Sequence, residues 1–175
     1  MEQPRRKPNR LKDYDYSTAG AYFITICTKD RKSLLWEDVG ASIARPAAVR
    51  LSPYGHIVDQ AIRQIPAHYP AVLLENYTVM PNHIHLLLRI DTDPDGQALD
   101  APTISQVIQQ MKGIVTKRIG WPIWQKLFHD HVIRNERDYL KIWEYIEYNP
   151  IRWKEDCFFI DEGTDEQCSP LHPYD

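Results

Sequence analysis

Two histidines separated by one residue lie in an apolar stretch, YTVMPNHIHLLLRI (Tyr77–Ile90). In a β-strand, successive side chains point to opposite faces, so His83 and His85 share one face and Ile84 takes the other. Two imidazoles side by side on a rigid strand supply half of a metal site. Pro81 cannot donate a ladder hydrogen bond, which predicts a bend just before the strand. The alternative is a pair of partly buried histidines that only pack and hydrogen-bond.

A phenol and an amide come together on a helix expected over residues 135–149, which Asn135 caps. At about 100° per residue, one side of this helix is apolar and faces the core. Tyr145 and Asn149 lie one turn apart at the edge of that face. Tyr148 lies nearly opposite and is expected to face water. A tyrosine that only packs on the core is the alternative for Tyr145. The apolar face consists of Tyr139, Ile142, Trp143 and Ile146.

Four segments, taken in order, carry a resemblance to a known family. They are YFITICTKDR (Tyr22–Arg31), VMPNHIHLLL (Val79–Leu88), DHVIRNERDY (Asp130–Tyr139) and YIEYNP (Tyr145–Pro150). Together they resemble the REP-associated tyrosine transposases, which are relatives of the single-tyrosine HUH transposases of bacterial insertion sequences. The resemblance covers about residues 14–154.

This resemblance implies a single-strand DNA endonuclease and transposase that acts at hairpin repeats. His83 and His85 match the metal-binding pair, and Tyr145 matches the nucleophile that forms a 5′-phosphotyrosine. Asn149 matches the polar residue that completes the metal site, where many insertion-sequence relatives carry a longer glutamine. Mixed nitrogen and oxygen ligands favour Mg²⁺ or Mn²⁺ as the turnover metal. The alternatives are a non-catalytic DNA-binding protein derived from a transposase, an RNA-binding module, and a metal hydrolase that uses activated water.

Other residues compete for parts of this assignment. His129 and His131 form a second His-x-His pair with the same spacing, so spacing alone does not choose between the two pairs. Trp36, Trp121 and Trp124 are candidates for stacking on unpaired bases, with core packing as the alternative for each.

The charge of the chain is unevenly distributed. The 175 residues carry a net charge of −3, which argues against indiscriminate nucleic-acid binding. Residues 1–13 nevertheless form a basic arm, which we expect to contact DNA phosphates, with a solvated tail as the alternative. Its candidate DNA-binding residues are Arg5, Arg6, Lys7 and Arg10.

The location and assembly follow from composition and from the family. Three widely spaced cysteines fit neither a disulfide framework nor a zinc site, so a reducing cytoplasm is expected. The sequence has no apolar run near 18 residues and no signal peptide is predicted, so no membrane partner is expected. We expect a monomer rather than the homodimer of the insertion-sequence relatives.

The order of expected elements is strand, helix, strand, strand, helix, strand, helix. That order predicts an α+β, ferredoxin-like split βαβ fold with an antiparallel sheet of four to five strands. Helices are expected on one face, with a late helix carrying the tyrosine. Residues 14–154 are expected to form the nuclease domain, and residues 155–175 an irregular tail. Strands are predicted over 21–28, 71–80, 83–90 and 128–133, and helices over 51–68, 103–119 and 135–149, with a flexible acidic linker over 91–102.

Overall fold

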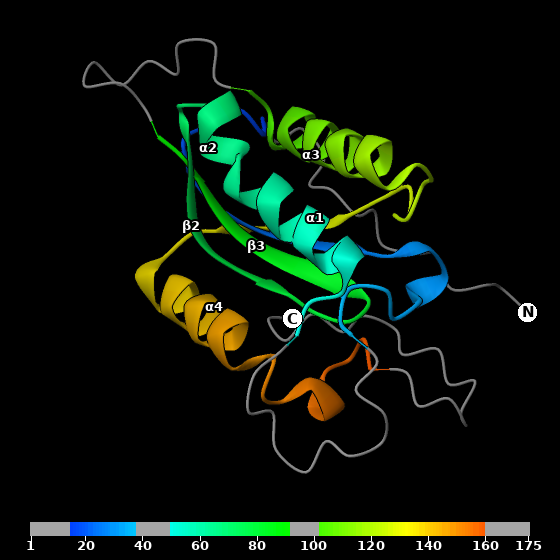
Figure 1. Cartoon of the computed structure of the whole chain (residues 1–175). Helices are drawn as coiled ribbons and strands as arrows, with labels where there is room; N and C mark the ends of the chain where they lie inside the picture. Colours follow the sequence, from blue (N-terminus) through cyan, green and yellow to red (C-terminus); the bar gives the residue numbers. More distant parts are fainter. Residues whose placement is uncertain (1–14, 38–49, 92–101, 160–175) are drawn as a thin grey trace, which may run out of the picture.

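The structure is a computed structural model that describes residues 15–37, 50–91 and 102–159 (Figure 1). Within these ranges the chain forms one four-stranded antiparallel sheet in the order β2-β3-β1-β4. The predicted α+β fold is therefore confirmed, with four strands. The linker predicted over 91–102 lies almost entirely outside the described residues. The strands are β1 (Gly20–Cys27), β2 (Val72–Val79), β3 (His83–Ile90) and β4 (His129–Ile133).

Local capping signals set the helix boundaries. Ser52 caps the first helix by accepting a hydrogen bond from the Gly55 N–H at 3.1 Å, and Thr103 and Asn135 cap two later ones. The helix predicted over 51–68 is divided at Gln64, because Pro66 has no N–H to continue the ladder. The elements are α1 (Pro53–Arg63), α2 (Ile65–His68), α3 (Ile104–Ile119) and α4 (Glu136–Tyr148), with short 3₁₀ turns η1 (Lys29–Arg31) and η2 (Trp153–Glu155).

The two faces of the sheet carry different layers. One face packs against α1, α2 and α3, and its strand residues alternate with those of the opposite face. On the opposite face, Phe23 and Leu87 pack against Ile142 and Ile146 of α4. The expected helices on one face are therefore α1–α3, whereas α4 covers the other face (Figure 1). Because His85 lies two residues from Leu87 on β3, the histidine pair faces the α4 side.

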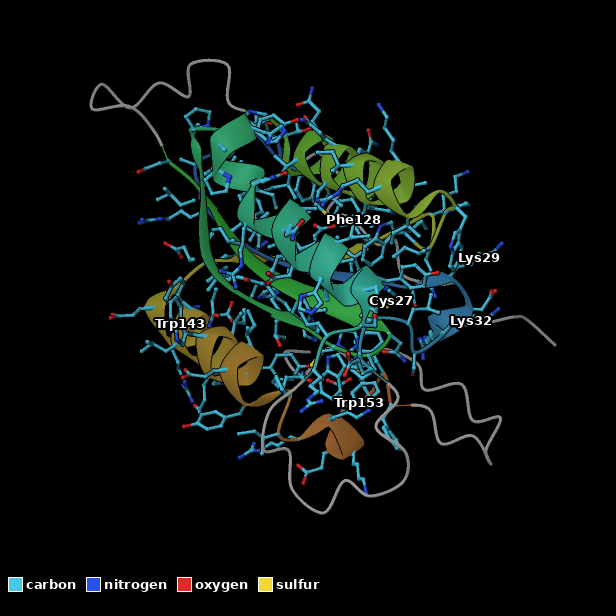
Figure 2. All side chains as sticks on the ribbon, in the orientation of Figure 1. Cys27, Lys29, Lys32, Phe128, Trp143 and Trp153 are labelled. Carbon is cyan, nitrogen blue, oxygen red and sulfur yellow. The ribbon has the colours of Figure 1, made fainter. Side chains whose placement is uncertain are left out.

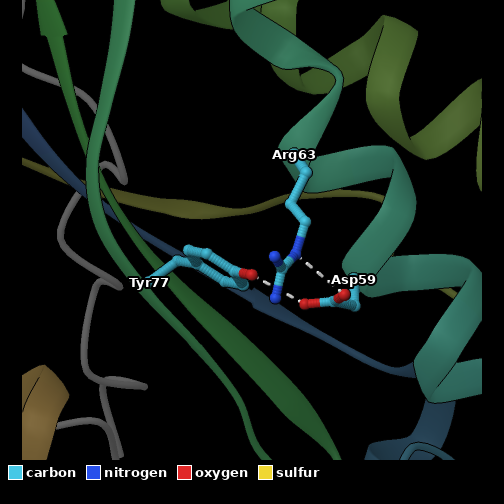
Figure 3. Close-up of polar contacts among 3 residues, drawn as sticks. All are labelled: Asp59, Arg63 and Tyr77. Atoms are coloured by element: carbon cyan, nitrogen blue, oxygen red, sulfur yellow. Dashed lines mark hydrogen bonds and ion pairs between the residues drawn. The ribbon is translucent and has the colours of Figure 1, made fainter.

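Polar contacts attach α1 to β2 on the first face. The Asp59 carboxylate accepts hydrogen bonds from the Tyr77 hydroxyl at 2.7 Å and from Arg63 Nε at 3.0 Å (Figure 3). The Arg63 guanidinium lies 5.9 Å from the centre of the Tyr77 ring. Burial, followed by the hydrogen bond to Asp59, raises the pKa of Tyr77 to about 12. The phenol therefore remains a donor at neutral pH and holds the helix on the sheet.

A second contact fixes α4 on the opposite face. Glu75 lies at a β-bulge in β2 and accepts a hydrogen bond from the Tyr139 hydroxyl at 2.7 Å. The same carboxylate pairs with Arg89 of β3 at 2.8 Å. Burial, followed by the hydrogen bond to Glu75, raises the pKa of Tyr139 to about 12. The first turn of the tyrosine-bearing helix is thus attached to two strands at once.

None of the helices in the described ranges is long and apolar enough to span a bilayer.

Tyr139→Phe is expected to lower the free energy of unfolding by about 1 kcal/mol, because one hydrogen bond to a carboxylate is lost while the ring remains. Chemical denaturation measures the change. Tyr148→Phe is the matched control, since Tyr148 is 46% exposed on the same helix. Equal destabilisation by both variants would show that the Glu75 contact does not hold α4.

Candidate active site

The two histidines of β3 are held with their Nε2 atoms together. His83 Nδ1 lies 2.9 Å from Asn82 Oδ1, and the Asn82 amide nitrogen donates to the Phe158 carbonyl at 2.9 Å. The amide orientation is therefore fixed, and His83 Nδ1 must carry the proton. His85 Nδ1 lies 2.9 Å from the Thr25 hydroxyl. The two Nε2 atoms are 3.0 Å apart.

Burial determines the charge of His83. His83 is fully buried and His85 is 1% exposed. Burial, with a smaller contribution from the Arg31 charge, lowers the pKa of His83 to about 3, so His83 is neutral at physiological pH. Two nitrogens bound to one ion at about 2.1 Å and at right angles lie about 3 Å apart. The separation in the structure therefore fits two ligands of a single cation.

One carboxylate joins the candidate nucleophile to the neighbouring amide. The Tyr145 hydroxyl donates to Asp156 Oδ2 at 3.0 Å, and Asn149 Nδ2 donates to the same oxygen at 2.6 Å. The Tyr145 ring lies 5.2 Å from the His85 ring. Asn149 is 4% exposed, and no described residue donates a hydrogen bond to its buried Oδ1. This oxygen is consequently a free acceptor of the kind that a cation binds.

The phenol of Tyr145 is protonated in this environment. Burial raises its pKa well above the usual value, and the negative charge of Asp156 raises it further. Tyr145 therefore acts as a hydrogen-bond donor at neutral pH. A nucleophilic role requires a nearby proton acceptor or a cation that offsets the raised pKa.

Asp156 is the site residue that the sequence analysis missed. It lies beyond the last predicted helix, in a segment without periodic apolar residues. In the structure its carboxylate oxygen and the ring nitrogens of His83 and His85 lie within 4.8 Å of one another. Phe158 N–H donates to the other Asp156 oxygen at 2.7 Å, which fixes the carboxylate. The only signal in the sequence is an acid placed shortly after the helix that carries Tyr145.

Aromatic side chains cover the histidines from the side of this segment. The Phe158 ring lies 4.5 Å from the His83 ring, and the Trp153 ring lies 5.9 Å from it. The Arg31 guanidinium is 5.4 Å from the centre of the Phe158 ring. Figure 2 shows Trp153 in the chain that follows α4, below the end of the sheet. Residues that follow the predicted domain boundary at 154 therefore complete the walls of the site.

The remaining candidates divide into three groups. His131 Nε2 lies 2.8 Å from Asp138, and among the described residues the only three-residue cluster with metal-ligand geometry is His83, His85 and Asp156. The second histidine pair thus forms no such cluster there. The basic candidates Arg5, Arg6, Lys7 and Arg10 lie outside the described residues.

The three candidate stacking tryptophans have different surroundings. Trp36 Nε1 donates to the Val79 carbonyl at 2.7 Å, and Trp124 is 7% exposed. Trp124 belongs to the core, and Trp36 is partly buried with its ring centre 6.3 Å from that of Trp153. Trp121 is 39% exposed and retains an accessible ring.

Comparisons with known proteins identify relatives over most of the chain, although no family model matches. An uncharacterised protein of Haemophilus influenzae is 31% identical over 175 residues, covering 89% of this chain and 94% of the relative. A second Haemophilus influenzae protein, assigned by name to the REP-associated tyrosine transposases, is 26% identical over 146 residues and covers 79% of this chain and 74% of its own length. The Escherichia coli REP-associated tyrosine transposase is 25% identical over 138 residues, covering 78% and 70%.

A solved structure shares the fold. The structure of a REP-associated tyrosine transposase bound to a REP hairpin superposes with a TM-score of 0.59 at 23% identity. The match covers 87% of this chain and 74% of that one. At this level of identity the likeness extends to the arrangement of the sheet and helices.

Proposed function

We infer that this chain belongs to the REP-associated tyrosine transposase family, and on that basis we propose that it is a metal-dependent single-strand DNA endonuclease and transposase. The observation that carries the proposal is the shared carboxylate of Asp156. It holds the Tyr145 hydroxyl and the Asn149 amide beside the histidine pair. A nucleophile, a proton acceptor and a set of cation ligands thus converge on one spot.

The proposed substrate is a DNA hairpin with adjacent single strand, and the proposed location is the cytoplasm. A related transposase has been solved bound to a REP hairpin, which supports this choice. The basic residues Arg5, Arg6, Lys7 and Arg10 remain proposed phosphate contacts. We propose a monomer as the working unit, because every residue of the proposed chemistry comes from one chain.

Cleavage in this proposal is a transesterification by Tyr145. The phenol oxygen forms a bond to the scissile phosphorus, while the bond from phosphorus to the 3′ oxygen breaks. The phenol proton passes to Asp156, which already accepts its hydrogen bond. The products are a 5′-phosphotyrosine and a free 3′-OH, whose oxygen takes a proton from solvent. Attack by another 3′-OH reverses the step and rejoins DNA, so no external energy source is needed.

The donor set fits a divalent ion, which we propose to be Mg²⁺ or Mn²⁺. His83, His85 and the free Oδ1 of Asn149 would hold it, with Asp156 as a further oxygen ligand at the same spot. When bound, such an ion polarises the scissile phosphate and neutralises its developing charge. Asn149 Nδ2 already donates a hydrogen bond to Asp156, which orients the side chain and leaves Oδ1 as the atom that would bind the ion.

The proposed unit of function extends past residue 154. The domain boundaries at 14–154 and 155–175 remain predictions, but Asp156 hydrogen-bonds to Asn149 and Phe158 packs on His83, and both partners are proposed ligands. A deletion variant designed to keep activity should therefore retain residues up to Phe158.

A denaturing-gel assay tests the proposed function. A DNA hairpin with single-stranded flanks, taken from repeats near the gene, is labelled at its 3′ end. It is then incubated with the protein and Mn²⁺ or a chelator. We expect a labelled band shifted by the mass of the protein, present only with the metal. Cleavage without an adduct would instead identify water as the nucleophile.

A non-catalytic DNA-binding role is the second candidate. Its support is the burial of both histidines under Trp153 and Phe158, which restricts access to the site. Hairpin binding without either cleavage or adduct would favour this role over the transposase.

Asp156→Asn is expected to lower the rate of adduct formation by about 10²–10³-fold, because the proton acceptor for Tyr145 is lost while the shape is kept. Single-turnover kinetics with excess enzyme measure the step. Asp138→Asn is the matched control, since Asp138 lies on α4 and pairs with His131 away from the tyrosine. An unchanged rate in Asp156→Asn would remove this residue from the chemistry.

A further inference from the structure

A surface hollow of about 220 Å³ lies beyond the end of β1. The turn η1 supplies one wall and the segment after α3 supplies the other. Figure 2 shows two of its residues, Lys29 and Lys32, at this end of the molecule close to Cys27. The volume is smaller than that of a typical drug-sized pocket and suits a single base or sugar-phosphate unit. The lining residues are Lys29, Asp30, Lys32, Leu34, Trp121 and Pro122.

The two lysines give the hollow its positive charge. Both side chains are exposed, and no ion pair within the described ranges joins either ammonium to a carboxylate. Asp30 also lines the hollow, so the net charge of the lining is one positive unit. Two accessible cations on one short turn are suited to the phosphates of a strand that passes across it.

The turn that carries the lysines has an unfavourable backbone conformation. Asp30 and Arg31 are consecutive non-glycine residues in the left-handed region, with φ of 57° and 52°. The conformation is held by hydrogen bonds from the Thr28 hydroxyl to the Lys32 carbonyl at 2.8 Å and from the Lys29 N–H to the Ile123 carbonyl at 2.6 Å. Such strain persists where a functional arrangement depends on it. In this turn, Lys29 and Lys32 line the hollow, whereas Arg31 contacts Phe158 instead.

Trp121 supplies an aromatic surface at the same place. Its ring meets the Tyr54 ring edge-on, with centres 6.0 Å apart, and 39% of the residue remains exposed. Gly120, in the left-handed region at φ of 91°, ends α3 and directs the chain toward the turn. An exposed indole beside cations is the arrangement on which proteins stack unpaired bases.

The hollow and the proposed catalytic residues are connected through Arg31. Its guanidinium lies over the ring of Phe158, which in turn contacts the His83 ring. Arg31 lies between Lys29 and Lys32 in the chain, so the turn η1 both contacts the wall of the proposed site and lines the hollow.

We propose that this hollow binds one unpaired nucleotide of a single-stranded DNA flank, with its base stacked on Trp121 and its phosphates bound by Lys29 and Lys32. The proposal rests on the proposed function, because it requires a single strand that passes the site. It assigns to the hollow the recognition of the flank, separately from recognition of the hairpin stem.

Fluorescence-anisotropy titrations of the full-length chain test this assignment. All proteins carry Tyr145→Phe, so that binding is measured without cleavage. The probes are one labelled hairpin with blunt ends and the same hairpin with a 5′ or a 3′ single-stranded extension. We expect Trp121→Ala to weaken binding of one extended hairpin by about ten-fold and to leave the blunt hairpin unchanged. Trp121→Phe keeps an aromatic ring and should restore most of the affinity.

Salt dependence tests the role of the lysines. In Lys29→Ala/Lys32→Ala, the slope of log affinity against log salt for that extended hairpin should fall by about 1.4, since each single-strand phosphate contact contributes about 0.7. Lys117→Ala/Lys141→Ala is the matched control, because it removes two exposed lysines from α3 and α4. Equal losses with the blunt hairpin, no loss with either extension, or an equal slope change in the control would overturn the proposal.

The binding titrations and the adduct assay can fail independently, so they test the hollow and the proposed function separately. If the parent enzyme forms no adduct but Trp121→Ala still loses only extension-dependent binding, the hollow is a single-strand site on a non-catalytic protein. If the adduct forms and the hollow variants bind all three probes like the parent, the transposase assignment stands and the hollow has another role.

Discussion

Tyr145→Phe is expected to abolish the covalent protein–DNA adduct and to lower strand cleavage by about 10⁴-fold or more, as loss of a catalytic nucleophile does. The change removes one oxygen atom and leaves the ring in place against Phe23 and His85. The hydrogen bond from the hydroxyl to Asp156 is lost, while the contacts of the ring remain. The variant should therefore fold and bind the hairpin while failing to cleave it. The 3′-labelled gel assay measures both products.

Tyr148→Phe is the control for this result. Tyr148 lies on the same helix but is 46% exposed, and its ring contacts the Arg152 guanidinium. Its variant should form the adduct at the rate of the parent protein. If Tyr148→Phe loses the adduct and Tyr145→Phe keeps it, the nucleophile is Tyr148 and our assignment is wrong. Loss in neither variant would require a nucleophile other than these two.

Much of the fold could be predicted because its signals are local. Ser52, Thr103 and Asn135 each cap a helix where the sequence analysis placed one. The alternation of residues along β3 correctly placed His83 and His85 on one face of the sheet. The helical period likewise put Tyr145 at the edge of the core and Tyr148 in water. These features depend on residues close together in the chain.

The parts that the sequence did not reveal depend on contacts between distant residues. Which face of the sheet α4 covers is set by Phe23 and Leu87, whose partners on α4 cannot be assigned from periodicity. Asp156 reaches the site only because the chain turns back after α4 and Phe158 packs on His83. No local pattern marks such a return, so a segment that looked like an irregular tail became part of the site.

The roles of the site residues could be predicted only through the family resemblance. Spacing alone left the pair His129 and His131 equal to the pair His83 and His85. In the structure they differ because Asp138 at the start of α4 pairs with His131, whereas His85 faces the tyrosine. The tertiary position of α4 therefore separates two identical sequence motifs.

His85→Ala is expected to weaken Mn²⁺ binding by at least about 100-fold, because a directly bound ligand contributes more than the 10–100-fold effect of an outer residue. Electron paramagnetic resonance of free Mn²⁺ measures the affinity without any DNA. Thermal unfolding gives an independent readout, since an ion at 100 times its Kd stabilises the folded protein by about 2.7 kcal/mol. The parent protein should gain this stabilisation from Mn²⁺, and His85→Ala should not.

The second histidine pair provides the control, because it offers the same residue type at the same spacing. His131→Ala should keep the Mn²⁺ affinity of the parent protein, although it loses the contact with Asp138 and some stability. Loss of Mn²⁺ binding in His131→Ala, with retention in His85→Ala, would move the metal to β4. Retention in both variants would separate the histidines from metal binding altogether. If His85→Ala alone loses the ion, then the adduct should disappear with it, since the phenol of Tyr145 is protonated and buried beside the same ligands.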